Sequence, residues 1–271
     1  MSSATFVLST GRCGTQWLHE AFSGAFEGAL RVEHEPLHNR YEPARMLAAG
    51  DPAALPPARA KAILAHFESV ERTLDSRNYL ETGHPCWSSI PAIARRLPGR
   101  VRVVHLVRHP VTMAFSWLSH GAYVPPLLPA LPAKEFVTPI GDGVTFPEYR
   151  ERWPELSPLE KCLYYWAEVN AFALKLEERG GFPWLRLRYE DLFGQNSDAL
   201  RALLRFTELP DSAAERMAPG KSVDQFRFAL AAWPEPERIS RHPAVIALAE
   251  RFGYRPTDYA ADDLRKRFFC P

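Results

Sequence analysis

One stretch near the start of the chain decides the fold: Phe6-Val7-Leu8-Ser9-Thr10-Gly11-Arg12-Cys13-Gly14-Thr15-Gln16-Trp17-Leu18. Its apolar beginning has the length and the β-branched and aromatic character of a buried strand, and it breaks at once into small and polar residues. From Thr15 onward, apolar residues recur at helical spacing, as Trp17, Leu18, Ala21, Phe22 and Phe26. The stretch therefore predicts a strand, a turn and a helix in direct succession.

The turn within this stretch has the composition of an anion site. The first N–H groups of a helix have no partner within the helix, and the positive end of the helix dipole lies beside them. Gly11 and Gly14 allow the backbone to come close to a ligand. Arg12 supplies a cation and Thr15 a hydroxyl. The turn predicts a phosphate site, and the alternative is an ordinary strand-turn-helix with a solvated arginine.

The spacing of this turn argues against an ordinary ATPase. The Walker A pattern G-x-x-x-x-G-K-[ST] has a lysine between its last glycine and the hydroxyl residue. Here Gly14 directly precedes Thr15. Cys13 has two interpretations: a thiol activated by Arg12 and the helix N-terminus, or a small residue that donates its backbone N–H.

A second stretch repeats the arrangement. Val101–Val107 is an apolar run of strand length, and Arg108-His109-Pro110 follows it directly. Pro110 suits the first turn of a helix, and apolar residues continue from it at helical spacing. Ser116 lies eight residues after Arg108, about two helical turns into this helix. Two strand ends thus present cations and hydroxyls.

Together with a third run, Tyr189-Glu190-Asp191-Leu192 after a late strand, these stretches resemble the sulfotransferases that use 3′-phosphoadenosine 5′-phosphosulfate (PAPS). The 5′-phosphosulfate loop of that family reads Lys or Arg, Ser, Gly, two hydroxyl residues and often Trp-Leu. Its 3′-phosphate motif has an Arg and, eight residues later, a Ser. The three motifs occur in the family's order. Cys13, Gln16 and His109 depart from the commoner residues, and Arg12 stands where cytosolic members have Lys.

The resemblance implies a set of donor-binding residues. The 5′-phosphosulfate loop corresponds to Arg12, Cys13, Gly14, Thr15, Gln16 and Trp17, with Trp17 also available to the adenine. Arg108 and Ser116 correspond to the 3′-phosphate site, and Tyr189 to the adenine site. A basic loop near the C-terminus closes over the 3′-phosphate in the family. Lys221 is our candidate for it, with Arg227, Arg238 and Arg241 equally available.

Transfer of a sulfuryl group to an alcohol needs a general base, and two residues are candidates. Glu35 lies in a Glu-Pro-Leu run like the one that supplies the base in many carbohydrate sulfotransferases, and it is our first choice. His84 lies close to where cytosolic members have a catalytic His, displaced by one residue. The alternatives are a solvated loop or a metal cluster of Glu33, His34, Glu35 and His38, and a structural role for His84.

Alternating strand and helix patterns predict an α/β fold with a central, mainly parallel sheet flanked by helices on both faces. The resemblance adds the P-loop NTPase-like architecture of the sulfotransferases. We expect one domain over residues 1–271, because this length suits a single α/β domain. A proline-rich insertion at about 122–156 is expected to act as a lid that shapes the acceptor pocket, or else to be a surface insertion or a dimer contact.

Composition limits the partners. A formal net charge of +1 gives no reason to expect a nucleic-acid partner. The four cysteines are far apart and form no C-x-x-C pair, which argues against a zinc site and favours the cytoplasm. No run of eighteen apolar residues occurs, and the first strand begins almost at once, so we expect neither a signal peptide nor membrane insertion. The sequence would read the same if a membrane anchor had been removed from the protein. It contains no pattern that predicts an oligomeric state.

The function expected from the resemblance is in-line transfer of the sulfuryl group from PAPS to a hydroxyl or amine, with PAP as the other product and no metal. The Glu35 run favours a carbohydrate-like or small-molecule alcohol as acceptor. Two alternatives stay open: a non-catalytic PAP-binding or scaffold protein, and a nucleotide-dependent kinase.

Overall fold

The structure is a computed structural model that describes residues 1–125, 134, 136–194, 196–217, 230 and 232–269. The chain divides into two compact units, each built from two segments. The first unit contains Met1–Val107 and Ala173–Val223, and the second contains Arg108–Phe172 and Asp224–Pro271. The single domain expected over the whole chain stays a prediction.

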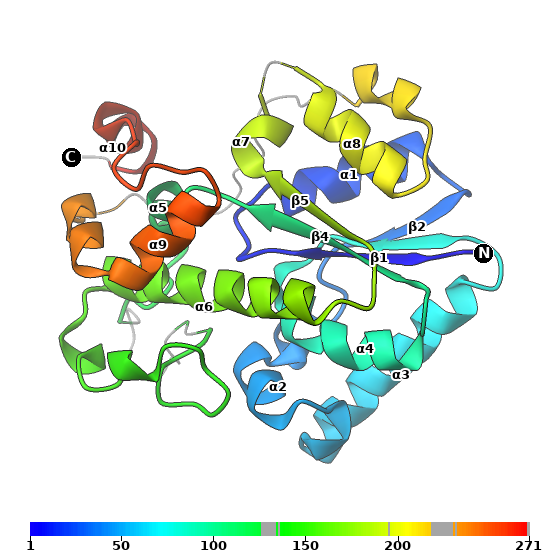
Figure 1. Ribbon diagram of the computed structural model, residues 1–271, viewed down its shortest axis with the longest axis horizontal. Helices are drawn as coiled ribbons and strands as arrows, with labels where there is room; N and C mark the ends of the chain where they lie inside the picture. The colour runs from blue at the N-terminus through cyan, green and yellow to red at the C-terminus, as the bar shows by residue number, and fades with distance from the viewer. Residues whose placement is uncertain (126–133, 135, 195, 218–229, 231, 270–271) are drawn as a thin grey trace. The chain divides into compact units, whose positions relative to one another are not determined.

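A five-stranded parallel sheet forms the centre of the first unit (Figure 1). Its strands, in the spatial order β2-β3-β1-β4-β5, are β2 (Leu30–Glu33), β3 (Asn78–Glu81), β1 (Ala4–Leu8), β4 (Val101–Val107) and β5 (Trp184–Arg188). Because every pair is parallel, the carboxyl ends of all five strands lie at one edge. This sheet, with helices on both faces, confirms the predicted α/β class.

Helices cover both faces of this sheet. On one face lie α1 (Thr15–Ala25) and α8 (Asp198–Phe206), and on the other lie α3 (Pro57–Thr73) and α4 (Ile90–Arg96) (Figure 1). The core under α1 and α8 takes alternate residues of the strands, because successive side chains of a strand point to opposite faces. It includes Val7, Leu80, Val104, Leu187, Leu18, Phe22, Leu200 and Leu204.

Shorter elements complete the first unit. They are the 3-10 turns η1 (His38–Tyr41), η2 (Pro52–Ala54), η3 (His84–Ser89) and η6 (Asp211–Glu215), and the short helices α2 (Pro43–Ala49) and α7 (Tyr189–Leu192). Strand β2 ends at Glu33, and Glu35, two residues later, adopts a positive φ of 47° that an extended strand does not allow. Helix α4 starts at Ile90, directly after the η3 turn.

The second unit packs helices and turns around a long helix. Its elements are α5 (Pro110–Leu118), η4 (Pro147–Tyr149), η5 (Trp153–Glu155), η7 (Pro236–Arg241), α9 (Pro243–Arg251) and α10 (Ala261–Phe268). Helix α6 (Pro158–Arg179) begins in this unit and ends in the first. Its start is a capping box, in which the Ser157 Oγ donates to Glu160 (2.7 Å) and accepts from the Glu160 backbone N–H (3.4 Å).

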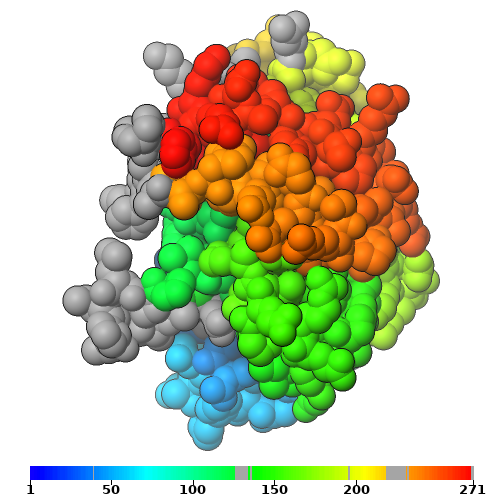
Figure 2. Space-filling model, turned by 90° about the vertical axis from the view of Figure 1, so that its left-hand side faces the viewer, coloured from blue at the N-terminus to red at the C-terminus, as the bar shows by residue number. Residues whose placement is uncertain are grey.

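The two segments of the second unit meet at the start of α6. The Tyr149 hydroxyl lies 3.0 Å from Nδ1 of His242, whose Nε2 lies 3.3 Å from the Glu160 carboxylate. Figure 2 shows the same meeting at the surface, where η7 and α9, in orange, lie against the green earlier segment. Helix α10 was not predicted. Across the described residues, no helix combines the length and the apolar character needed to cross a membrane.

Candidate functional site

The predicted phosphate loop joins β1 to α1 in the first unit. Gly14 is the N-cap of α1 and has a φ of 75°, and its position offers no side chain to cap the first N–H groups of the helix. Arg12 also has a positive φ, of 57°, which is costly for a residue with a Cβ and is typical of functional loops. The loop therefore joins Arg12 in sequence to the first N–H groups of a helix, and both are typical of an anion site.

The remaining loop residues have distinct surroundings. Cys13 is fully buried, and its thiol donates to the Gly11 carbonyl at 3.1 Å, which suits a small structural residue. Thr15 is buried, whereas Gln16 is exposed and donates to Glu20 at 2.8 Å along the helix surface. The side chain of Gln16 thus interacts with its own helix, and only its backbone N–H belongs to the helix start.

An aromatic group lies beside the loop. The rings of Trp17 and Tyr189 both pack on Phe193, with centroids 5.0 and 4.6 Å from it. Phe193 also covers Gly14, since a Cβ on Gly14 would lie 2.2 Å from its ring. The two residues expected at the adenine are therefore connected by a third that sequence reasoning missed. In the sequence, the signal for Phe193 is an aromatic residue about one helical turn after Tyr189.

The two candidate bases are in direct contact. Nδ1 of His84 lies 2.7 Å from Oε1 of Glu35, although the two residues are 49 positions apart. Glu35 lies two residues after the end of β2, and His84 three residues after the end of β3. The backbones approach closely there, because a Cβ on Gly83 would lie 2.5 Å from the Glu35 nitrogen. Only glycine fits at position 83 without a shift of the Glu35 loop.

Histidines surround the Glu35 carboxylate. His38 lies 3.3 Å and His34 3.9 Å from its oxygens, and Nδ1 of His34 is 3.1 Å from the Thr82 hydroxyl. Burial raises the pKa of Glu35, but the His84 hydrogen bond and the three histidines outweigh it and lower the pKa to about 2. Glu35 is thus a carboxylate at neutral pH, and the nitrogen of His84 that faces it carries the proton.

The sheet brings the loop and this pair to one edge. Strand β1 leads into the phosphate loop, and β3 and β2 lead into the segments of His84 and Glu35. These three strands are neighbours and run parallel, so their carboxyl ends meet. The His19 ring of α1 also lies 6.1 Å from the His34 ring. Within the first unit, the predicted phosphate loop and the segments of Glu35 and His84 therefore leave the sheet at one edge, the edge at which open α/β sheets bind ligands.

The residues expected at the 3′-phosphate belong to the second unit. Arg108 directly follows β4 and is buried, and its carbonyl accepts a hydrogen bond from the Trp166 indole at 2.8 Å. Ser116 is buried within α5. His109, which departs from the family pattern, lies with Nε2 3.1 Å from the Arg255 carbonyl and so connects α5 to the segment after α9.

The basic C-terminal loop stays a prediction. Lys221 and Arg227 lie outside the described residues. Arg238 pairs with Glu235 and, at 3.4 Å, with Glu160. Within the described part of the chain, no three His, Cys, Asp or Glu side chains are grouped so that they could hold a metal ion.

A protein-family model and several solved structures are similar to this chain. The sequence model described as the sulfotransferase domain matches residues 2–228. A sulfotransferase of Alicyclobacillus acidocaldarius shares the fold with a TM-score of 0.52 at 14% identity, covering 98% of this chain and 99% of its own. No curated protein sequence matches significantly.

Two further solved structures have lower scores. The sulfotransferase domain of a Synechococcus PCC 7002 olefin synthase has a TM-score of 0.48 at 17% sequence identity, and the match covers 93% of this chain and 95% of its own. Mouse sulfotransferase SULT7A1, complexed with PAP, has a TM-score of 0.49 at 14% sequence identity, and the match covers 98% of this chain and 88% of the mouse chain.

Proposed function

The chain belongs to the sulfotransferase family, and we propose that it transfers the sulfuryl group of PAPS to a hydroxyl or amine of a small-molecule or glycan acceptor. The observation that carries this proposal is the contact of His84 with Glu35 at the sheet edge where the phosphate loop begins. A base and an anion site at one edge are what the reaction requires. The expected cytoplasmic location stays a prediction.

The residues of the first unit fit the donor. Its phosphates need N–H groups and a cation, and the uncapped start of α1 and Arg12 supply them. Its adenine needs an aromatic surface, which Trp17, Tyr189 and Phe193 offer. PAPS would supply an activated sulfur whose bond to the 5′-phosphate oxygen breaks as the acceptor oxygen bonds to it. Arg12 and the helix N–H groups would stabilise the charge left on that phosphate.

His84 and Glu35 have different roles in this proposal. A carboxylate with a pKa of about 2 is a weak base, so Glu35 is unsuited to take a proton from an alcohol. His84 Nε2 takes that proton, while Glu35 holds the ring by Nδ1 and stabilises the imidazolium that forms. We therefore assign the base to His84 and orientation of its ring to Glu35.

The test is transfer from PAPS to a panel of sugars, phenols and aliphatic alcohols, followed as PAP release and as sulfated product by mass spectrometry. We expect product from at least one alcohol, and a loss of about 10²- to 10⁴-fold in kcat for His84→Ala. Unchanged kcat in His84→Ala would remove His84 from the role of base. PAP binding without transfer to any acceptor would favour the scaffold, and phosphorylated product from ATP would favour the kinase.

A further inference from the structure

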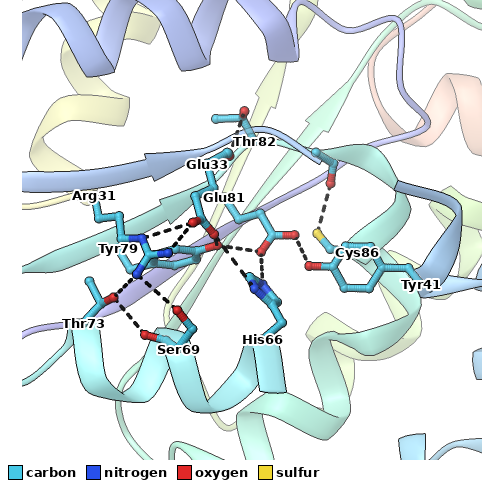
Figure 3. A network of polar contacts seen from close by, with 11 residues as sticks. Arg31, Glu33, Tyr41, His66, Ser69, Thr73, Tyr79, Glu81, Thr82 and Cys86 are labelled. Atoms are coloured by element: carbon cyan, nitrogen blue, oxygen red, sulfur yellow. Dashed lines mark hydrogen bonds and ion pairs between the residues drawn. The ribbon is translucent and has the colours of Figure 1, made fainter. Parts of the chain in front are cut away.

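A buried network of charged and hydroxyl side chains lies between the sheet and α3 (Figure 3). At its centre is Glu81, which has no exposed surface. One oxygen of its carboxylate accepts from the Tyr41 hydroxyl at 2.5 Å. The other lies 2.9 Å from Nε2 of His66 and 2.9 Å from the Tyr79 hydroxyl. Burial and then the Glu81 charge raise the pKa of Tyr41, so this tyrosine stays protonated and donates.

The network extends across the sheet to β2. The Tyr79 hydroxyl also lies 2.7 Å from Oε2 of Glu33, so one tyrosine bridges two carboxylates. Arg31 pairs with Glu33 and donates to the Thr73 hydroxyl of α3 at 2.9 Å. Each carboxylate thus has a basic partner: Arg31 for Glu33 and His66 for Glu81. A buried network with its partners in place fixes one arrangement of the segments that contribute to it.

Those segments are the ones that carry the His84–Glu35 pair. Glu33 ends β2 and Glu81 ends β3, and the two residues are paired in register. Tyr41 lies at the end of η1, after the Glu35 loop. The loop is therefore attached to the network at its start by Glu33 and at its end by Tyr41. His84 follows Glu81 by three residues.

The loop between these attachments needs such support. Glu35 and His38 have positive φ values of 47° and 42°, a conformation that persists only when the surroundings impose it. The Thr82 N–H donates to the Glu33 carbonyl at 3.0 Å, which holds the start of the loop beside the segment that leads to His84. The attachment at the far end is the hydrogen bond of Tyr41 to Glu81.

We propose that Tyr41, His66 and Glu81 are positioning residues that hold the Glu35 loop against His84 and so set the geometry of the base. This inference rests on the proposed function for its effect on turnover. The placement of the Glu35 loop can be measured without any acceptor. Tyr41 and His66 both bond to Glu81, and the three residues act on the base through the backbone segments that they join.

The first experiment uses Tyr41→Phe, which removes the donor to Glu81 and keeps the ring. We expect the His84–Glu35 contact to loosen, so that the pKa of Glu35, followed by carbon NMR of its carboxyl group, rises from about 2 toward 4.5. The groups that face this carboxylate are His84, His34 and His38, and none is altered. We expect kcat to fall about ten- to a hundredfold with the KM for PAPS unchanged.

A matched control separates positioning from loss of stability. Thr207→Val removes another buried hydroxyl of the first unit, which donates to the Leu203 carbonyl at 2.9 Å at the end of α8. We expect it to lower the melting temperature without changing the Glu35 pKa or kcat. A second pair of variants tests His66: His66→Gln keeps a donor near Glu81 and retains the wild-type Glu35 pKa, whereas His66→Leu removes the donor and raises that pKa.

The outcomes distinguish this inference from the proposed function. If the wild-type protein transfers no sulfuryl group but the Glu35 pKa still rises in Tyr41→Phe and His66→Leu, the proposed function fails and the positioning role stands. If Tyr41→Phe and His66→Leu melt at lower temperature but keep the Glu35 pKa of the Thr207→Val control, the network is only structural and the inference is wrong. Should Tyr41→Phe fail to fold, the His66 pair distinguishes the same two outcomes.

Discussion

Glu35 combines a half-buried position with an ionised carboxylate. Its hydrogen bond from His84 and the nearby His34 and His38 make the charged form the more stable one, against the effect of burial. The division of roles that we propose for Glu35 and His84 therefore depends on the hydrogen bond between them.

The pKa of Glu35 gives a prediction for stability. Its folded-state pKa of about 2 is below the ordinary 4.5, so Glu35 stabilises the folded protein above pH 4.5, and this contribution is lost as the pH falls toward 2. The difference in free energy of unfolding between wild type and Glu35→Gln should therefore shrink from pH 5 to pH 2. Urea unfolding at several pH values measures it. A difference that stays constant over this range would contradict the assigned pKa.

Arg12 is expected to act on the leaving group. Arg12→Ala should lower kcat by about 10²- to 10³-fold, by analogy with the loss of one oxyanion donor. Arg12→Lys is the matched variant, because it keeps the charge and introduces the residue usual in cytosolic members of the family. We expect Arg12→Lys to retain most of the activity. A loss of less than about threefold in Arg12→Ala would exclude Arg12 from this role.

At the level of single residues, the sequence singled out Glu35 and His84 as alternative candidates for the base but did not predict their contact. Glu35 and His84 were candidates from separate motifs, and their 49-residue separation is closed only by the pairing of β2 with β3. The buried network was missed for a different reason. Arg31 and Glu33 alternate with apolar residues as in a strand with one solvated face, whereas α3 covers that face.

The junction of β1 and α1 is the element at which we expect the donor to bind. Its strand-turn-helix order and the start of α1 at Thr15 agree with the prediction, because apolar periodicity and glycine mark such a junction directly. The contact of Phe193 with Gly14 could not be predicted, since it comes from a segment almost 180 residues later whose placement depends on the order of the strands.

This contact can be tested by a double-mutant cycle. Gly14→Ala should destabilise the protein, because alanine costs about 1–2 kcal/mol at a left-handed φ and its Cβ would overlap the Phe193 ring. In a Phe193→Ala background the overlap is absent, so Gly14→Ala should lower the free energy of unfolding only by the backbone cost of alanine at a left-handed φ. Chemical unfolding of the four proteins gives the coupling free energy. Equal costs in both backgrounds would mean that the ring does not restrict position 14.

Arg108, two residues before the start of α5, is the other predicted donor contact. Arg108→Ala should weaken PAP binding more than it lowers kcat, because the 3′-phosphate lies away from the transferred sulfur. Arg108→Lys keeps the charge and should lose less affinity. Titration calorimetry measures the affinity of both variants for PAP. Affinity for PAP that is unchanged in Arg108→Ala would remove Arg108 from the 3′-phosphate site.

The proline-rich insertion shows what a sequence leaves open at this level. Its described part is held to α6 by Glu168, whose buried carboxylate accepts from the N–H groups of Thr145 and Phe146, each at 2.8 Å. Proline content predicted an irregular segment, but not this attachment. Residues 126–133 and 135 lie outside the described residues, so the role of a lid stays a prediction.

On the scale of the whole molecule, the parallel sheet and the helices on its two faces were predictable because strand and helix patterns alternate along the chain. Helix α10 was not predictable in this way, since most of its residues are charged and only Leu264 and Phe268 are buried in it. The acceptor depends on loops whose shape the sequence does not encode in any local pattern.

The most direct test of the central claim is the thermal melting of the whole protein with PAP, adenosine 5′-phosphosulfate or ATP at equal concentration. A ligand at a hundred times its dissociation constant stabilises the folded state by about 2.7 kcal/mol, which raises the melting temperature by several degrees. We predict the largest rise with PAP, because the resemblance to PAPS-dependent sulfotransferases predicts sites for both its 5′-phosphate and its 3′-phosphate. A rise with ATP and none with PAP would contradict the account and favour a kinase.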